Sequence, residues 1–444
     1  MRTRCQVPEQ VAVLIAVMAV WLIVPAAGWA GAEPGAAPRT LTLEQALSIA
    51  VQHNREIQQA QENRHYVRGQ YIEARASALP QVTLSGGMGQ SNDLMTHRLT
   101  GAPPDSEVTS AQAELTQPLF TWGQVSAALR AAKVGLAIAD DQVDSAQQGV
   151  IRQVTAAFYD VLLAREFAAL AAQNLEQKVR HLDEAERKHA AGLVTDYDVL
   201  AARVAVQNAR PEVIRSQNVI SAALQHFRFL LGAGDDNIDV AGSWDCPAEP
   251  LPPYEVVLAA ALAQRPELRA LRNQMAFSQQ LVKIAKAGDK PRIGLNATYG
   301  WGQVETGPLS ADGEAWSAGI YLSFPVFNGL RTQGQVRQAE SAVASLKIGE
   351  QQLIDGLTLA ARIAVDAVQE AREIVAALAG TVQQAERLLQ MAEKGYELGV
   401  MTRLDVDDAE LNLLNARSNL ARAQRDCLVS AVELKWVMGE LRFE

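Results

Sequence analysis

The fold of this chain is decided by a proline-free stretch of seventy residues, positions 123–192, which reads GQVSAALRAAKVGLAIADDQVDSAQQGVIRQVTAAFYDVLLAREFAALAAQNLEQKVRHLDEAERKHAAG. Its apolar side chains recur at alternating steps of three and four, which is typical of a long helix packed lengthwise on neighbours. These positions are Val150, Val154, Ala157, Val161, Ala164, Ala168, Ala171, Leu175 and Leu182. At about 1.5 Å per residue the helix would be roughly 100 Å long, which is too long for a compact domain.

A second copy of the stretch follows 207 residues later in the sequence. The same apolar register recurs at Leu357, Ala361, Ala364, Val368, Ala371, Val375, Leu378, Val382 and Leu389. Upstream of the long stretches the spacing between the copies is 211 residues, as between Pro80 and Pro291. The four-residue difference falls in a predicted strand hairpin, where loops absorb insertions. The chain is therefore an internal duplication of one helical plan.

The duplication predicts a mainly α fold with a small β part, built from duplicated long-helix hairpins. The predicted division is a signal peptide at 1–30, a first repeat at 31–232 (strand hairpin 81–119, long helix 123–191, helix 195–231), a linker at 233–253, and a second repeat at 254–444 (strand hairpin 292–325, long helix 329–398, helix 402–438).

The first thirty residues have the pattern of an exported protein. A basic start with Arg2 and Arg4 precedes an apolar run at 11–27, and the small residues Gly28 and Ala30 follow it, which indicates a cleavable signal peptide. The alternative is a membrane anchor helix. The formal net charge of −10 argues against nucleic acid as a partner.

Alternating apolar and polar residues predict strands of about nine residues within 292–325, the length of a tilted membrane strand. The same alternation also suits a half-buried soluble sheet. If the strands enter a membrane, several chains must contribute to one barrel, because the open edges of a four-stranded sheet cannot face lipid. The long apolar stripes of the predicted helices are rich in alanine, whose small side chain lets helices approach closely. They favour a cylinder of closely packed helices.

The duplicated order of elements, with AGLVTDYDV at 191–199, GYELGVMTRLDV at 395–406 and N-A-R in both following helices, resembles the TolC family of outer membrane efflux and secretion channels. The resemblance implies a homotrimer with a twelve-stranded barrel, to which each chain gives four membrane strands, and a trimeric α-helical tunnel in the periplasm. It also implies outer membrane lipid, a periplasmic adaptor protein and an inner-membrane pump as partners.

The resemblance assigns a gate to the end of the tunnel. Tyr396 and Asp198 match a tyrosine and an aspartate that link neighbouring helix pairs, and Met401 stands where the family has a reinforcing arginine. Arg403 lies two residues away from that position. The alternative for Asp198 is a helix cap, because it follows Thr195 by three residues.

Two further sets of residues match family positions at the same end. Asp405 and Asp408 lie on one helix face and match an acidic ring around the pore. The positions that match the adaptor docking motif are Gly192, Leu193, Val194, Gly399 and Val400. The alternative for this motif is a tight helix–helix turn in which glycine ends the first helix.

No pattern in the sequence predicts catalysis. The six histidines have no metal-ligand spacing, and no phosphate-binding loop is present, so we expect no enzyme activity, no metal and no cofactor. Cys246 and Cys427 are the thiols of the exported part, and the sequence leaves their pairing open. The predicted function is a passive outer membrane duct, and the alternative is a soluble periplasmic coiled-coil scaffold or adaptor. The cargo is not determined by the sequence.

Overall fold

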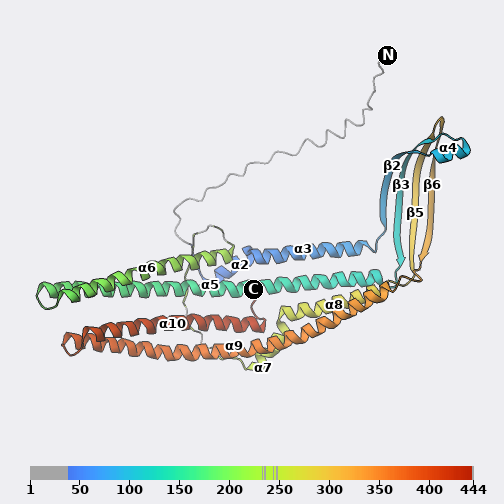
Figure 1. Cartoon of the computed structure of the whole chain (residues 1–444). Coiled ribbons are helices and arrows are strands. Elements are labelled where there is room, and N and C mark those ends of the chain that lie inside the picture. The colour runs from blue at the N-terminus through green and yellow to red at the C-terminus, as the bar shows by residue number, and fades with distance from the viewer. Residues whose placement is uncertain (1–38, 233, 235–236, 244, 247–248, 443–444) are drawn as a thin grey trace, which may run out of the picture. The chain divides into compact units, whose positions relative to one another are not determined.

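The computed structural model describes residues 39–442 apart from 233, 235–236, 244 and 247–248, so the predicted signal peptide lies outside the described residues. With the labels of Figure 1, the elements are β1 (Arg39–Leu41), α2 (Leu43–His53), α3 (Arg55–Ala76), β2 (Gln81–Asn92), α4 (Leu94–Thr100), β3 (Asp105–Phe120), α5 (Gln124–Ala190), α6 (Asp196–Leu231), β4 (Ile238–Val240), α7 (Tyr254–Gln264), α8 (Pro266–Lys286), β5 (Arg292–Thr306), β6 (Leu309–Ser323), α9 (Arg331–Glu397) and α10 (Arg403–Met438).

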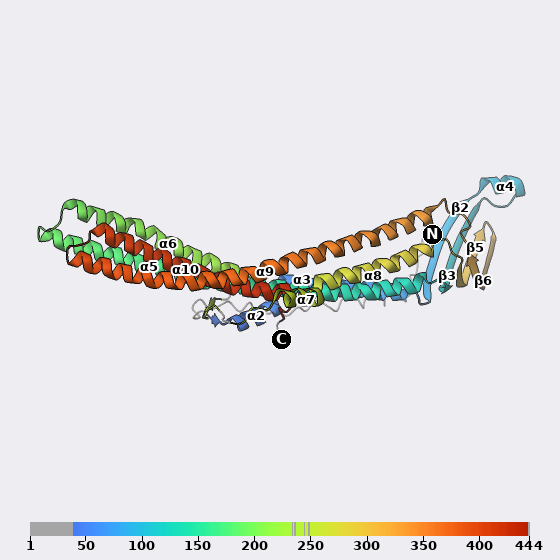
Figure 2. The ribbon, with the colours of Figure 1, turned by 90° about the horizontal axis from the view of Figure 1, so that it is seen from below.

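Two long-helix hairpins form the bulk of residues 40–444. Helices α5 and α9 have 67 residues each, and their partners α6 and α10 have 36 each. Figures 1 and 2 show α5 and α9 running from the four-stranded sheet at one end to the hairpin turns at the other. Helices α3 and α8 lie alongside the parts of the long helices that are nearer the sheet, whereas α6 and α10 lie alongside the parts nearer the turns (Figure 1).

The strands form one antiparallel sheet in the order β2-β3-β5-β6. Strands β5 and β6 have 15 residues each, so the expected length of about nine residues was too short. The segment between β2 and β3 contains helix α4, which lies within the predicted strand hairpin 81–119 and was not predicted. Val82, Leu84, Trp316 and Ile320 are exposed on one face, and among the described residues β2 and β6 each pair on one side only. The sheet therefore requires neighbours on both edges and an apolar environment on that face.

The main core lies where the short helices near the middle pack on the long ones. Phe158 of α5 and Phe227 of α6 are buried and meet edge to face, with ring centroids 6.0 Å apart. The kink between α2 and α3 is fixed by Asn54, whose carbonyl Oδ1 accepts from the backbone of Glu56 and whose Nδ2 donates to the carbonyl of Leu230 at 2.6 Å. A second core joins α7 to α9 and α10 around Val257 and Val368. Each repeat thus has its own core.

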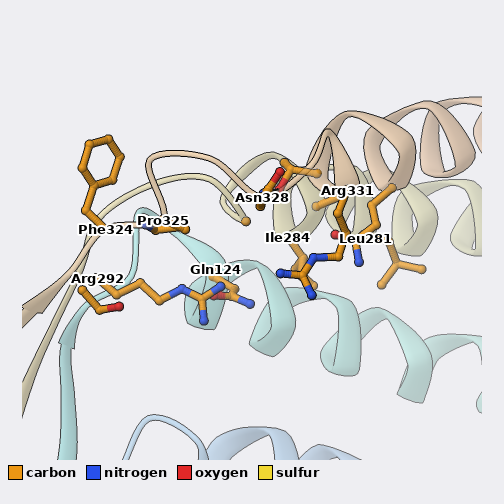
Figure 3. Close-up of a pocket in the computed structure, with 13 residues that line it drawn as sticks. Gln124, Leu281, Ile284, Arg292, Phe324, Pro325, Asn328 and Arg331 are labelled. Atoms are coloured by element: carbon orange, nitrogen blue, oxygen red, sulfur yellow. Dashed lines mark hydrogen bonds between the residues drawn. The ribbon is translucent and has the colours of Figure 1, made fainter.

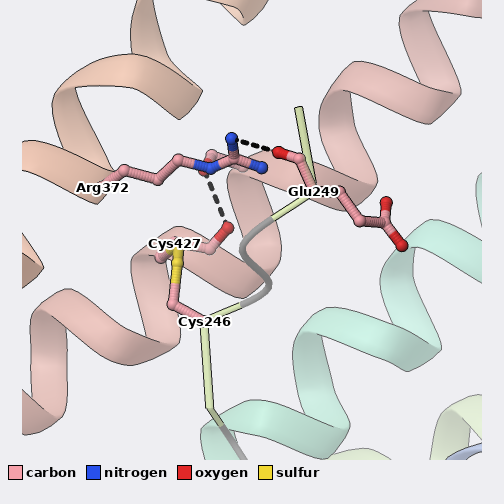
Figure 4. Close-up of a disulfide and its surroundings, with 5 residues drawn as sticks. Cys246, Glu249, Arg372 and Cys427 are labelled. Atoms are coloured by element: carbon pink, nitrogen blue, oxygen red, sulfur yellow. Dashed lines mark hydrogen bonds between the residues drawn. A yellow bond between two sulfur atoms is a disulfide. The ribbon is translucent and has the colours of Figure 1, made fainter. Parts of the chain in front are cut away.

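The connector between the repeats is tied to both of them. Its strand β4, which the sequence did not predict, pairs with β1 and accepts a hydrogen bond from Arg165 at the carbonyl of Val240. Cys246 and Cys427 form a disulfide with 5.9 Å between their Cα atoms, which settles the pairing that the sequence left open (Figure 4). A disulfide that closes so long a loop restricts the unfolded chain strongly.

The helices carry apolar side chains that nothing in the described chain covers. Exposed large apolar side chains include Ile348, Leu359 and Ile363 of α9 and Val204 and Ile214 of α6. Rows of this kind on long helices indicate further helices alongside. Among the described residues no helix combines the length and hydropathy needed to cross a bilayer.

Candidate gate at the helix turns

The two hairpin turns have the same backbone design. At each turn a glycine adopts a left-handed conformation, Gly192 with φ 74° and Gly399 with φ 75°. The amide of the following residue reaches back five positions, from Leu193 to the carbonyl of Lys188 at 2.9 Å and from Val400 to that of Gly395 at 2.9 Å. This pattern ends an α-helix with its last carbonyls satisfied, and a residue with a Cβ would be strained at the glycine.

A capping box begins the returning helix at both turns. One oxygen of Asp198, Oδ2, accepts from the amide of Thr195 at 2.8 Å and from its hydroxyl at 2.7 Å. Asp405 accepts from the same two groups of Thr402, both at 2.7 Å. The threonine hydrogen bonds lower the pKa of both aspartates. Each aspartate therefore remains charged at its helix N-terminus, where the helix dipole favours an anion.

The structure places the predicted gate residues Tyr396 and Met401 at the second turn and Asp198 at the first. Tyr396 is half-buried against Ala392, Val406 and Ala409, and the ammonium of Lys188 lies 4.8 Å from the centre of its ring. Met401 folds back over Gly395, where any added Cβ would meet its side chain. Within the described chain no hydrogen bond joins Asp198 to Tyr396. The single chain thus brings Tyr396 and Met401 together and leaves Asp198 on the other turn.

The predicted docking residues form two exposed tips. Leu193 is 74% exposed and Val400 is 77% exposed, whereas Val194 is half-buried. Gly192 and Gly399 are exposed as well. These residues form a tight helix–helix turn and are also exposed. The two alternatives for them, a structural turn and an adaptor docking motif, are therefore compatible.

A cluster of charged residues joins the two hairpins a little away from the turns. We call it the ionic seam and define it as Lys178, His181, Arg403, Asp407 and Glu410. Glu410 is only 6% exposed and accepts from Lys178 at 2.7 Å and from His181 at 2.5 Å. A buried carboxylate needs a cation and hydrogen-bond donors, and here α5 supplies the ammonium of Lys178 and the imidazole of His181 to a carboxylate on α10.

The bonds in the ionic seam also fix the roles of its members. A guanidinium nitrogen of Arg403 donates to Nδ1 of His181 at 2.7 Å, so Nε2 of that ring carries the proton and donates to Glu410. Burial opposes the charge of Glu410, but its hydrogen bonds from His181 and Lys178 outweigh this effect and lower its pKa to about 2. Arg403 is thus held by His181 and Asp407 within the described chain.

The acidic residues of α10 divide between two faces. Asp407 and Glu410 point to α5, whereas Asp405 and Asp408 are exposed. The sequence predicted the exposed pair, and the pair that faces α5 was missed. A signal was available, because Glu410 falls among the buried apolar positions Val406, Ala409 and Leu413 of the α10 seam, where a carboxylate requires a cation from another helix.

This chain belongs to the family of outer membrane efflux proteins, whose model matches residues 46–233 and 257–440. It is 23% identical over 376 residues to the outer membrane protein TolC of Vibrio cholerae, covering 83% of this chain and 84% of that protein. It is 25% identical over 403 residues to the alkaline protease secretion protein AprF of Pseudomonas aeruginosa, covering 88% of this chain and 83% of that one. The crystal structure of the Campylobacter jejuni CmeC outer membrane channel superposes with a TM-score of 0.81 at 17% identity, over 90% of this chain and 85% of that chain.

The family confirms the main predictions. The fold is the TolC-type helical tunnel with a small sheet, the chain lies in the outer membrane and extends into the periplasm, and it acts as an efflux or secretion channel rather than an enzyme. Channels of this family are homotrimers that work with a periplasmic adaptor protein and an inner-membrane pump, so the predicted partners are confirmed as well. The alternative of a soluble scaffold is not supported.

Proposed function

We propose that the chain forms a passive duct whose periplasmic entrance is closed at the two helix turns and is lined by carboxylates. The observation that carries this proposal is the exposure of Asp405 and Asp408 on the face of α10 that is turned away from the ionic seam. In a trimer the two positions supply six carboxylates. Such a ring raises the local concentration of cations and excludes anions.

The gate in this proposal is a hydrogen bond from Tyr396 to Asp198 across neighbouring helix pairs. It is supported by the capping geometry, because both cap bonds of Asp198 end on Oδ2 and leave Oδ1 for a donor from another helix. Met401 stands at the position of the family's arginine, and the ammonium of Lys188 lies over the ring of Tyr396 and also binds Glu184 at 2.7 Å. The cation at this gate, Lys188, is therefore shared between Tyr396 and Glu184. We expect the gate to open more readily than the gates of relatives that keep the arginine.

In this proposal the exposed tips at Gly192, Leu193, Val194, Gly399 and Val400 receive the adaptor. Exposed aliphatic side chains on rigid turns suit helical partners, because the turns offer apolar contact surface and no flexible loop has to lose conformational entropy on binding. In this proposal the cargo is chosen by the pump, since one duct serves whatever the pump delivers to it.

Planar bilayer recording on the detergent-purified trimer tests the proposed function. We expect cation-selective channels, and we expect the double variant Asp405→Asn with Asp408→Asn to lose most of that selectivity while remaining trimeric. Anion selectivity of the unmodified trimer, or unchanged selectivity of the double variant, would contradict the acidic ring.

A further inference from the structure

A hollow of about 670 Å³ lies where the second strand hairpin meets the helices. It is lined by residues from the start of α5, the end of α8, the ends of β5 and β6 and the start of α9, and we call it the junction pocket. Its volume is in the range of small-molecule sites. Figure 3 shows that Arg292 and Arg331 extend toward each other across the pocket, with Gln124 beside Arg292, whereas Phe324 points away.

The junction pocket has no carboxylate among its lining residues. Two acids lie near it in the sequence, and both have partners: Asp289 lies 3.4 Å from the ammonium of Lys290, and Glu340 binds Lys286 at 2.8 Å. Among the described residues, no ion pair or hydrogen bond is made by the guanidinium group of Arg292 or of Arg331. Residues 283–292 and 331–340 together contain six basic and two acidic side chains, in a chain with a net charge of −10. This pocket is therefore a local concentration of unpaired positive charge.

We infer that the junction pocket binds a phosphate group. Two guanidinium groups that face each other repel unless an anion lies between them, and their planar forks match the oxygens of a phosphate by paired hydrogen bonds. The side-chain amide of Gln124, at the start of α5, supplies a further donor from a third element. The arrangement thus provides charge and donors from three separate segments around one space.

The internal duplication shows that this charge is not required by the fold. Arg292 corresponds to Gln81 in the first copy through the spacing of 211, and Arg331 corresponds to Gln124 through the spacing of 207. The first copy builds the same strand-to-helix junction with glutamine at both positions. The arginines are thus specific to the second copy, and a trimer would have three such pockets.

The phosphate group has two possible sources. Arg292 lies on the same strand face as Asn296 and Thr298, opposite to the apolar face with Ile293 and Leu295, which favours a phosphorylated solute in the duct. Phe324 and Phe327 nearby are exposed, and aromatic side chains at this position are typical of a membrane interface, where a phospholipid headgroup would be available.

Isothermal titration calorimetry of the full-length trimer with inorganic phosphate tests the inference. We expect saturable binding, weakened about ten-fold by Arg292→Gln or Arg331→Gln and lost in the double variant, which restores the residues of the first copy. The matched control is the double variant Lys347→Gln with Arg387→Gln, which removes two exposed charges from α9 outside the pocket and should bind as the unmodified trimer does.

Native mass spectrometry of the trimer released from lipid nanodiscs separates the two sources. Retention of phosphatidylglycerol by the unmodified trimer, and its loss in the arginine double variant, identifies a lipid headgroup. Phosphate binding without lipid retention identifies a solute. The inference is overturned if the arginine double variant binds phosphate as tightly as the control, or if neither phosphate nor phosphatidylglycerol binds to the unmodified trimer.

Discussion

The first and second copies of the hairpin have the same backbone and different side chains where they meet. Both have long helices of 67 residues, returning helices of 36 residues, a left-handed glycine at the turn and a threonine–aspartate capping box. The seam positions differ. Lys178 and His181 of the first copy correspond to Ala385 and Leu388 of the second.

The same contrast holds on the returning helix. Arg403, Asp407 and Glu410 of α10 correspond to Asp196, Leu200 and Arg203 of α6. The contact of α5 with α10 is therefore ionic. In the equivalent contact of α9 with α6, which a trimer would form between chains, α9 presents Ala385 and Leu388 instead of the lysine and histidine, so the same ion pairs cannot form. Duplication thus preserved the helix lengths and the turns. The charged side chains of the ionic seam distinguish the contact of α5 with α10 within one chain from the contact of α9 with α6 between chains.

Removal of Glu410 should have the largest effect on this contrast. Glu410→Ala leaves Lys178 and His181 without their buried carboxylate, and breaking a buried pair in this way costs about 3 kcal/mol. We expect a clearly lower midpoint of thermal unfolding, followed by circular dichroism on the trimer. The matched control is Arg203→Ala at the equivalent position of the first copy, which is exposed and should shift the midpoint much less. Equal shifts of the unfolding midpoint in Glu410→Ala and Arg203→Ala would contradict the proposed difference between the two helix contacts.

The ionic seam should also make stability depend on acid. Because the pKa of Glu410 is lowered from 4.5 to about 2 in the folded chain, its charged form stabilises the fold fully above pH 4.5. That contribution is lost as the pH falls from 4.5 toward 2. The difference in unfolding midpoint between the unmodified trimer and Glu410→Gln should therefore be constant from pH 7 to 5 and shrink below pH 4.5. A constant difference down to pH 2.5 would contradict this assignment.

The gate offers a smaller test of the same comparison. Met401→Arg adds a cation beside Tyr396 and should lower the open fraction in single-channel recordings, whereas Tyr396→Phe removes the donor and should raise it. The control is Val194→Arg, the equivalent of Met401 in the first copy, where His189 stands at the position that corresponds to Tyr396. If Met401→Arg and Val194→Arg change the open fraction alike, the effect is general electrostatics rather than a gate at the second turn.

The smallest expected effect is that of the caps. Asp405→Asn keeps an oxygen that accepts from Thr402, so helix content and the unfolding midpoint should remain unchanged. Asp198→Asn should likewise leave stability unchanged, and yet raise the open fraction if the gate is correct. Unchanged conductance in both Asp198→Asn and Tyr396→Phe would assign Asp198 to capping alone.

Local physics made most of the fold predictable from the sequence. The apolar register from Val150 to Leu182, the glycines at 192 and 399 and the threonine–aspartate pairs specify where helices run and turn, because these signals act within one or two helical turns. The predicted long helices 123–191 and 329–398 differ from α5 and α9 by one or two residues at each end. Helix α4 and strand β4 were missed, since short elements depend on the packing around them more than on their own pattern.

The candidate site was predictable only in part, for a related reason. The sequence by itself determined the duplicated hairpins, the exposed carboxylates of α10 and the residues at the turns, because each is written within one helix or one turn. Only the tertiary structure decided that Glu410 meets Lys178 and His181, that Cys246 meets Cys427, and that Arg292 faces Arg331. These partners lie from 39 to more than 200 positions apart in the chain, so no local pattern specifies them. Their pairing follows from the way the two copies pack, and that packing is a property of the folded chain.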